Sequence, residues 1–327
     1  MSPRVTVLVV NYMAGSYLAE CLRHLTLQTM RDFEAIVVDN GSADGSLDLA
    51  RAAVAGDTRF TFLAAERNLG FAAGNNRAAD AARAPLLATL NPDAFPAADW
   101  LEILLDAADR HPGVAMFGST QLKADDPAVL DGAGDQYFFI GLPWRGGFGW
   151  PAASLGSEGE VFGPCAAAAL YRRAAFSAVG GFDESFFCYV EDVDLAFRLR
   201  ARGHRCVQVP RAVVRHVGGA SAQAISGFAR YHGIRNMIWC FVKNMPSPLF
   251  WPILPMHLAV MTLVAARAHF QGFPQGWSGL IDALRCLPWA ARKRERAERV
   301  VSWPRLASAM VWRPGPYCSR APLTLKR

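Results

Sequence analysis

The sequence predicts an α/β fold with a mostly parallel sheet, followed by a helical C-terminal region. Apolar, β-branched runs alternate with segments of helical period over the first ~120 residues, which is typical of consecutive βαβ units. Apolar residues make up 52% of the 327-residue chain, enough for a large core. Residues 1–226 hold 19 Lys and Arg against 25 Asp and Glu, whereas residues 227–327 hold 15 against 3. We therefore expect two regions, 1–226 and 227–327, with different tasks.

The strands and helices of the first region alternate in order. Strands are expected at residues 4–10, 33–38, 60–63, 86–90 and 114–117, and helices at 17–27, 46–54, 74–82 and 100–108. The first strand, VTVLVV, is almost wholly apolar, as in parallel strands that are buried on both faces. Ligands bind beyond the carboxyl ends of such strands. Asn11, Asp39 and residues 91–93 follow strand ends, so their polar side chains are expected to converge on one site.

The later part of this region is less regular. Residues 119–160 lose the periodicity and are rich in Gly, Pro and aromatic residues, so we expect a long irregular stretch over the site, with room for a hairpin. Residues 161–172 are expected to form a strand that leads into a short helix. A helix at 191–202, a strand at 206–209, a helix at 224–245 and an 18-residue apolar run at 249–266 follow.

Several classes of protein are disfavoured by the cysteine usage, the N-terminus and the loops. The seven Cys include no C-x-x-C pair and no zinc spacing, so buried thiols in a reducing compartment are expected. The first residues lack the long apolar core and the cleavage site of a signal peptide, so the catalytic part is expected in the cytosol. The loop NGSADGS at residues 40–46 lacks the ending of a P-loop, and no G-x-G-x-x-G follows a strand, which disfavours kinases and dehydrogenases.

Asn91-Pro92-Asp93 and His216 are candidates for a metal site. The tripeptide can simply form a turn and cap a helix, or Asp93 can hold a divalent ion against a diphosphate. His216 precedes two glycines just after a strand. It is either an ordinary hydrogen-bonded His or a neutral imidazole that completes the coordination of Mg²⁺ or Mn²⁺.

Glu191, Asp192 and Asp194 crowd the first turn of a predicted helix, directly after the aromatic run FFCYV. One or two acids at this position only complement the helix dipole. Three acids within four residues exceed what a cap requires, and they repel one another unless a cation compensates. Such crowding is typical of sites with perturbed pKa values, so we expect a catalytic carboxylate here.

Six segments, in this order, resemble the successive signatures of glycosyltransferase family 2. They are VVNYMAGSYLAECLRHLTLQT, VVDNGSADGS, ERNLGFAAGNN, LNPDA, GGFDESFFCYVEDVDLAFRLRARGH and RHVGGAS. The resemblance covers residues 4–245 and is closest to the rhamnosyltransferase-like and galactofuranosyltransferase-like branch. It implies a GT-A fold, with a nucleotide-sugar-binding half at 1–118 and an acceptor-binding, catalytic half at 119–226. It also implies inverting transfer from a nucleotide diphosphate sugar to a saccharide or lipid-linked acceptor in cell-surface polysaccharide synthesis.

The resemblance also assigns roles to individual residues. By motif matching, the nucleoside would be held by Val10, Asn11, Tyr12 and Asp39, with Arg67 and Asn75 in the segment that lines the same pocket. Asn91-Pro92-Asp93 stands where the family carries its Asp-x-Asp metal motif, and the first Asp is Asn here. Mg²⁺ or Mn²⁺ would therefore rely on Asp93 and His216. Asp192 matches the catalytic base, which takes the proton of the acceptor hydroxyl, and Glu191 and Asp194 would orient groups or bind the acceptor.

Alternative functions stay open at this point. The Asn-Pro-Asp variant makes dTDP-rhamnose the first guess for the donor, with UDP-hexose and UDP-galactofuranose as alternatives. A sugar-phosphate nucleotidylyltransferase would need a basic, Gly-rich loop after the first strand, and residues 11–15 lack the basic residue. A non-catalytic scaffold should have lost Asp93 or Asp192, and both are present.

The C-terminal region has the composition of a membrane-directed segment. It holds six of the nine Trp, and no nucleic-acid-binding motif accompanies its basic charge, so a membrane surface is the better match. The run at 249–266 is nearly long enough to span a bilayer, but Pro252, Pro255 and His257 weaken that case. A true span and a buried core helix are the alternatives to the favoured interfacial segment. We expect peripheral contact through residues 249–312, including the basic stretch 292–296, at the inner face of the cell membrane.

Overall fold

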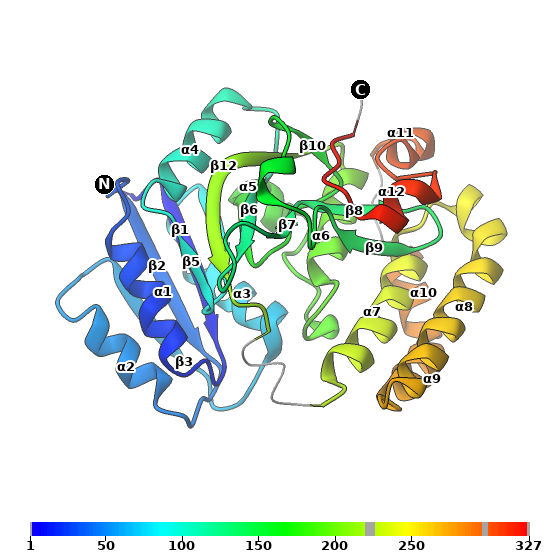
Figure 1. The fold of residues 1–327 in the computed structure, drawn as a ribbon, viewed down its shortest axis with the longest axis horizontal. Coiled ribbons are helices and arrows are strands. Elements are labelled where there is room, and N and C mark those ends of the chain that lie inside the picture. The colour runs from blue at the N-terminus through cyan, green and yellow to red at the C-terminus, as the bar shows by residue number, and fades with distance from the viewer. Residues whose placement is uncertain (1, 220–225, 296–299, 326–327) are drawn as a thin grey trace.

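The computed structural model describes residues 2–219, 226–295 and 300–325 (Figure 1). The strands are β1 Val5–Asn11, β2 Phe33–Asp39, β3 Phe60–Ala64, β4 Leu86–Leu90, β5 Ala94–Pro96, β6 Met116–Lys123, β7 Leu130–Ala133, β8 Asp135–Phe138, β9 Leu142–Arg145, β10 Gly159–Val161, β11 Ala168–Arg172 and β12 Cys206–His216. The helices are α1 Ser16–Thr26, α2 Ser46–Ala53, α3 Gly70–Ala81, α4 Trp100–Arg110, α5 Arg173–Ala178, α6 Glu191–Ala201, α7 Phe228–Asn244, α8 Ser247–Phe270, α9 Gln275–Arg285, α10 Leu287–Glu295, α11 Trp303–Ala307 and α12 Pro314–Ser319.

The central sheet has the strand order β10-β12-β6-β11-β4-β1-β2-β3, with β5 paired to β12 and β7 to β6. The strands β3, β2, β1 and β4 are parallel to their neighbours in that group, and β6 is parallel to β12. Only β11 interrupts this core, because it runs antiparallel to β4 and to β6. The mostly parallel sheet expected from the sequence is confirmed. The direction of β11 is not encoded in its apolar pattern, which is the same for either direction.

The first nine predicted elements all form, most of them within a few residues of the expected bounds. The apolar runs become strands that are buried along their whole length, as β1 and β2 show. The strand β5, three residues long and directly after Asn91-Pro92-Asp93, was not predicted. The predicted strand at 206–209 is too short, because a bulge between Val209 and Val213 interrupts the pattern of β12 before the strand continues to His216.

The expectation of irregular structure at residues 119–160 is wrong in part. The predicted hairpin exists as β8 and β9, which form a separate two-stranded sheet. However, β6 continues to Lys123, and β7 and β10 add to the central sheet. The single strand expected at residues 161–172 is two strands, because β10 ends at Val161 and β11 begins at Ala168. The strands β7 to β11 are only three to five residues long, too short for a period-two pattern to stand out.

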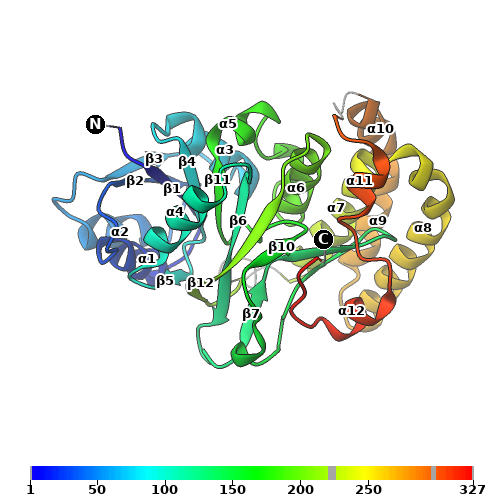
Figure 2. The same cartoon turned by 90° about the horizontal axis from the view of Figure 1, so that it is seen from above.

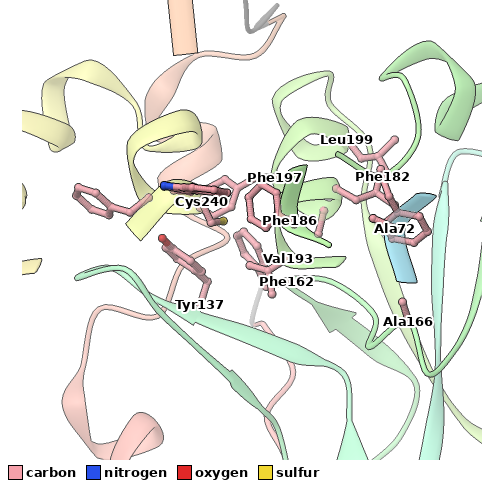
Figure 3. Packing of buried hydrophobic residues seen from close by; sticks show 14 of the residues in the cluster. Ala72, Tyr137, Phe162, Ala166, Phe182, Phe186, Val193, Phe197, Leu199 and Cys240 are labelled. Carbon is pink, nitrogen blue, oxygen red and sulfur yellow. The ribbon is translucent and has the colours of Figure 1, made fainter. Parts of the chain in front are cut away.

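The C-terminal helices pack against the catalytic part of the chain (Figures 1 and 2). One apolar cluster continues from the sheet through α6 into α7, α8 and residues 306–311. Figure 3 shows Phe162, Phe186 and Phe197 within this cluster, with Tyr137 of the hairpin and Cys240 of α7 alongside. The rings of Tyr137 and Phe197 lie 4.6 Å apart. The two regions therefore share one hydrophobic core across residue 226. That they have different functions stays a prediction.

Candidate active site

Two adjoining cavities open beyond the carboxyl ends of β1, β2 and β4. The larger has a volume of about 630 Å³ and the smaller of about 240 Å³. Both are lined by Phe71, Asn91, Arg145, Cys188 and Tyr189. Of the predicted site residues, the larger cavity is lined by Val10, Tyr12, Asn91, Asp93 and His216, and the smaller by Asn91, Glu191 and Asp192. The fold thus brings the metal candidates and the base candidate, about a hundred residues apart in the chain, to neighbouring cavities.

Asn11 and Asp39 are not among the residues that line the larger cavity. Both are buried, and the Asn11 Nδ2 donates to Asp39 Oδ1 at 2.7 Å, to Ser42 Oγ at 3.0 Å and to Ser46 Oγ at 2.8 Å. The other carboxylate oxygen of Asp39 accepts from the Ser42 backbone N–H at 3.1 Å. These bonds fix the loop that follows β2. A direct contact of either residue with a nucleoside stays a prediction.

Arg67 and Asn75 also stand outside the cavity lining. Arg67 is exposed, and its backbone lies against Gly41. Asn75 is buried in α3, where its Nδ2 donates to the Phe71 carbonyl at 3.0 Å. Their predicted contacts with the nucleotide remain untested.

Asn40 is a candidate that the sequence reasoning missed. It is buried at the larger cavity, and its Nδ2 donates to the Gly70 carbonyl at 3.1 Å. Its Oδ1 has no hydrogen-bond partner among the described residues, so it is available to a donor group on a ligand. An Asn-Gly pair is normally read as a turn, which hid this residue in the sequence.

Asn91, Asp93 and His216 form a compact group at the larger cavity. The His216 Nε2 lies 3.4 Å from Asp93 Oδ1 and accepts from the Asn91 Nδ2 at 3.2 Å. The buried Asn91 Oδ1 has no hydrogen-bond partner in the described part of the chain. Oxygen and imidazole ligands with one unsatisfied buried oxygen suit Mg²⁺ or Mn²⁺, so the residues present fit such an ion. Ala220 and Ser221 of the RHVGGAS motif lie outside the described residues.

A second layer orients His216 from behind. Its Nδ1 donates to Asp131 Oδ2 at 2.8 Å, and Arg145 Nη1 donates to the same oxygen at 2.5 Å. Metal-binding His residues usually make such a bond to a carboxylate, which fixes the ring and its tautomer. Burial alone would lower the pKa of His216, but the hydrogen bond to Asp131 and the nearby negative charge of Asp93 raise it overall. Neither Asp131 nor Arg145 was a candidate in the sequence, because both lie in the stretch without a recognisable motif.

Asp192 lies at the start of α6, half-buried in the wall of the smaller cavity. Its Oδ2 accepts from the Ala166 N–H at 3.1 Å and its Oδ1 from the Val193 N–H at 2.8 Å. Burial raises the pKa of its carboxyl, although these hydrogen bonds and the charge of Arg145 act in the opposite direction. A carboxylate with a raised pKa is a better proton acceptor, which is what a general base requires.

Glu191 and Asp194 differ sharply from each other. Glu191 lines the smaller cavity, and its buried Oε2 has no hydrogen-bond partner among the described residues. Burial and the nearby charge of Asp192 raise the pKa of Glu191 well above its usual range. Asp194 is also in α6 but is fully buried, and it accepts from Arg198, Lys243 and Asn244. This position leaves no contact with either cavity, so Asp194 suits the orienting part of its predicted role and not acceptor binding.

Asp135, Cys165 and Asp192 form a second cluster whose ligand atoms lie within 4.8 Å of one another. Burial raises the pKa of the Cys165 thiol to about 12, so it is protonated at neutral pH. Mg²⁺ and Mn²⁺ prefer oxygen and imidazole to thiol sulfur. Asp93 and His216 therefore suit such an ion better than this second cluster, where we expect the acceptor.

The comparison with protein families identifies the chain. The model of the glycosyl transferase family 2 matches residues 6–180. The N-acetylglucosaminyl-diphospho-decaprenol L-rhamnosyltransferase of Mycobacterium tuberculosis (strain ATCC 25618 / H37Rv) is 32% identical over 298 residues, covering 82% of this chain and 93% of that protein. The putative glycosyltransferase EpsH of Bacillus subtilis (strain 168) is 36% identical over 107 residues, covering 33% of this chain and 31% of that protein.

Solved structures share the fold at low sequence identity. The mannosyltransferase PcManGT from Pyrobaculum calidifontis, in complex with GDP-Man and Mn²⁺, has a TM-score of 0.55 at 19% identity, covering 94% of this chain and 86% of that chain. GalNAc-T7 with UDP, GalNAc and Mn²⁺ has a TM-score of 0.67 at 15% identity, covering 98% and 58% of the two chains. The GT-A architecture implied by the sequence is thus confirmed. The chain belongs to glycosyltransferase family 2 and is a glycosyltransferase of its rhamnosyltransferase-like branch.

Proposed function

We propose that this enzyme transfers L-rhamnose from dTDP-rhamnose to N-acetylglucosamine carried on a polyprenyl diphosphate, with inversion. The rhamnosyl group and the acceptor follow the name of the Mycobacterium tuberculosis relative, which aligns over most of both chains. The observation that carries the chemistry is the pair of adjoining cavities with Asp192 in one and Asp93 and His216 in the other. UDP-hexose and UDP-galactofuranose are the alternative donors, and a cell-surface polysaccharide is the expected product.

In this mechanism Asp192 takes the proton from the acceptor hydroxyl as its oxygen attacks the anomeric carbon. The bond between that carbon and the diphosphate oxygen breaks at the same time, and dTDP leaves from the opposite side. A raised pKa makes Asp192 a stronger base, while its two backbone hydrogen bonds hold the carboxylate in place.

The leaving diphosphate needs compensation for its growing negative charge. Asp93, His216 and the free oxygen of Asn91 would hold Mg²⁺ or Mn²⁺, which supplies that charge when bound. Asp131 keeps the His216 Nδ1 protonated, so that the Nε2 lone pair faces the Asp93 side.

A transfer assay with defined substrates tests this proposal. Purified enzyme is incubated with short-chain polyprenyl-diphosphate-linked N-acetylglucosamine and each of dTDP-rhamnose, UDP-glucose and UDP-galactofuranose, with Mn²⁺, Mg²⁺ or EDTA. We expect the rhamnosylated lipid only with dTDP-rhamnose and only with a divalent ion. Turnover with another donor would show that dTDP-rhamnose is not the specific donor. Full activity in EDTA would show that transfer does not need a divalent ion. Thermal-shift screening of nucleotide sugars gives an independent readout of donor binding.

We further propose that the enzyme docks on the cytosolic face of the membrane through α8. This helix is long and apolar enough to cross a bilayer, yet only 28% of its apolar 18-residue stretch is buried in the fold. Its outer face exposes Trp251, Leu263 and Phe270, which are 71%, 69% and 88% exposed. Figures 1 and 2 place α8 at the edge of the molecule farthest from β1–β3. An apolar face of this kind suits the boundary between headgroups and acyl chains.

The opposite face of α8 favours interfacial docking over a true span. His257 is buried there, with its Nδ1 bonded to the Ile140 carbonyl at 2.8 Å and its ring stacked on Phe241. Part of the basic stretch that begins at residue 292 is engaged within the fold. Lys293 pairs with Asp183, and Arg294 donates to the Met245 carbonyl, so these two cations are used within the fold.

Point substitutions on α8 test this docking. Replacing Trp251, Leu263 and Phe270 together by Ser should release the enzyme from vesicles of anionic phospholipid in a sedimentation assay. A matched control replaces Leu27 and Leu49, which are 62% and 51% exposed in the nucleotide-binding half, and should leave binding unchanged. Equal vesicle binding by the α8 variant and the wild type would refute the docking surface. Truncation after Asn244 is less informative, because it would remove part of the hydrophobic core.

A further inference from the structure

The segment that leads into the catalytic helix has an unusual backbone. Phe187, Tyr189 and Val190 have φ angles of 65°, 71° and 70°, the left-handed region that non-glycine residues rarely adopt. Val190 is β-branched, which makes this conformation especially unfavourable. Such strain persists only where surrounding contacts enforce it, and it gathers at functional sites. Asp192 follows two residues later, so this segment determines where the base lies.

Asn236 of α7 is the contact that holds the segment. Its side chain is fully buried, and its Nδ2 donates to the carbonyls of Phe186 at 2.9 Å, Cys188 at 2.9 Å and Tyr189 at 2.7 Å. The two N–H hydrogens of one carboxamide are thus shared among three backbone carbonyls within four residues of chain.

Arg235 fixes the orientation of that carboxamide. Its Nε donates to the Asn236 Oδ1 at 2.9 Å, so the oxygen side of the amide is satisfied and the nitrogen must face the segment. The Arg235 Nη2 also donates to the Phe186 carbonyl at 3.0 Å. The Arg-Asn pair therefore acts as one hydrogen-bonding unit on the segment.

The start of α3 closes the segment from the opposite side. The Ala72 N–H donates to the Phe187 carbonyl at 3.2 Å. Gly70 lies so close that a Cβ there would be 2.6 Å from the Phe187 carbonyl oxygen, so only glycine fits. The strained segment is thus held between α3 of the nucleotide-binding half and α7 of the C-terminal region.

We propose that Asn236 is a positioning residue for catalysis, which sets the location of Asp192 by fixing residues 186–190. The inference rests on the proposed function for the identity of the base, and it gives the C-terminal region a part in the chemistry besides any membrane contact. Cys188 and Tyr189 line both cavities, so release of the segment would disturb the acceptor side and the base together.

Substitution of Asn236 by Asp tests the proposal, because a carboxylate keeps the size but cannot donate to the three carbonyls. We expect kcat for transfer to fall about a hundredfold, as a displacement near 1 Å of a reacting group would cause. Hydrogen exchange of the amides in residues 186–192 should become faster at the same time, whatever the substrate.

The matched control is Gln28→Glu. Gln28 is also fully buried, and its carboxamide also bridges backbone groups, at Ala97 and Leu101, but it lies away from both cavities. If Asn236→Asp lowers the melting temperature no more than Gln28→Glu but lowers kcat far more, with faster exchange confined to 186–192, the positioning role is supported. Equal losses of kcat in the two folded variants, or unchanged exchange in 186–192, would overturn it. Failure of the wild type to transfer rhamnose would instead refute the proposed function, and the exchange data would still decide the role of Asn236.

Discussion

The two ends of the candidate site are built in different ways. At the metal end, Asn91 and His216 lie at the ends of regular strands, and side chains of the same sheet hold them. At the base end, Asp192 follows a strained left-handed segment that is held by α7 from the C-terminal region. The proposed metal ligands are thus held by contacts within the central sheet. The position of the base depends in addition on packing between two regions of the chain.

The largest effect is expected at the base. Asp192→Asn keeps the size of the side chain but removes its proton affinity, so transfer should fall about a thousandfold, while nucleotide-sugar binding is retained. Steady-state kinetics together with donor titration by calorimetry measure both quantities. Retained turnover would remove Asp192 as the base and would shift attention to Glu191, the other acid in the smaller cavity.

Substitutions at the metal end should act on binding. Asp93→Ala removes a direct ligand of the proposed ion, so the metal-dependent part of donor affinity should disappear. Asp131→Asn leaves the ligands in place but weakens the bond that orients His216, and metal affinity should fall about tenfold. Calorimetry with and without Mn²⁺ separates the two variants. Donor affinity that is the same in both conditions for the wild type would break the metal assignment.

Arg145 connects the two ends, which permits a test of their coupling. It donates to Asp131 on the metal side, stands opposite Asp135 in the β8–β9 hairpin, and its positive charge lowers the pKa of Asp192. In Arg145→Met the pKa of Asp192 should therefore rise, and the acid limb of the kcat/KM profile should move to higher pH.

Two further variants serve as controls for the Arg145→Met prediction. Arg145→Lys should keep the acid limb near its wild-type position, because it keeps the charge. Arg59→Met is the control, since Arg59 is a half-buried partner of Asp57 outside both cavities. A uniform loss of activity at every pH in Arg145→Met would show that Arg145 acts only through folding or donor binding.

The smallest effect is expected on acid stability, through the ion pairs that Lys243 of α7 makes with Asp183 and with Asp194 of α6. Lys243 pairs with Asp183 at 2.5 Å and with Asp194 at 2.6 Å, and the pKa of each carboxyl is lowered. Because these pKa values are lower in the folded state, the two carboxylates stabilise the fold above their unfolded pKa of about 4, and the contribution is lost as the pH falls below it. The melting temperature should therefore fall as the pH is lowered below about 4, and it should fall less steeply in Asp183→Asn than in the wild type. Parallel curves for the two proteins would contradict the assignment.

Regular elements and local motifs could be predicted from the sequence, whereas residues brought to the site by long-range pairing could not. The order of strands and helices through residue 117, apart from the short strand β5, followed from the apolar period, and the two acidic motifs followed from residue type and spacing. Asp131 and Arg145 could not be found this way, since they lie in short strands whose pairing brings them to the site. Asn236 was equally hidden, because its importance lies in three carbonyls about fifty residues earlier in the chain.

The sequence by itself determined the family, the parallel core of the sheet and the identity of the candidate base and metal ligands, because periodicity and local motifs are properties of short stretches of chain. Only the tertiary structure decided which acids face the cavities. Glu191 and Asp194 are three residues apart on one helix, yet Glu191 lines the smaller cavity and Asp194 is buried among cations. The tertiary structure also decided that α8 packs along one face and exposes the other. Long-range packing sets both outcomes, and it depends on partners that lie far away in the sequence.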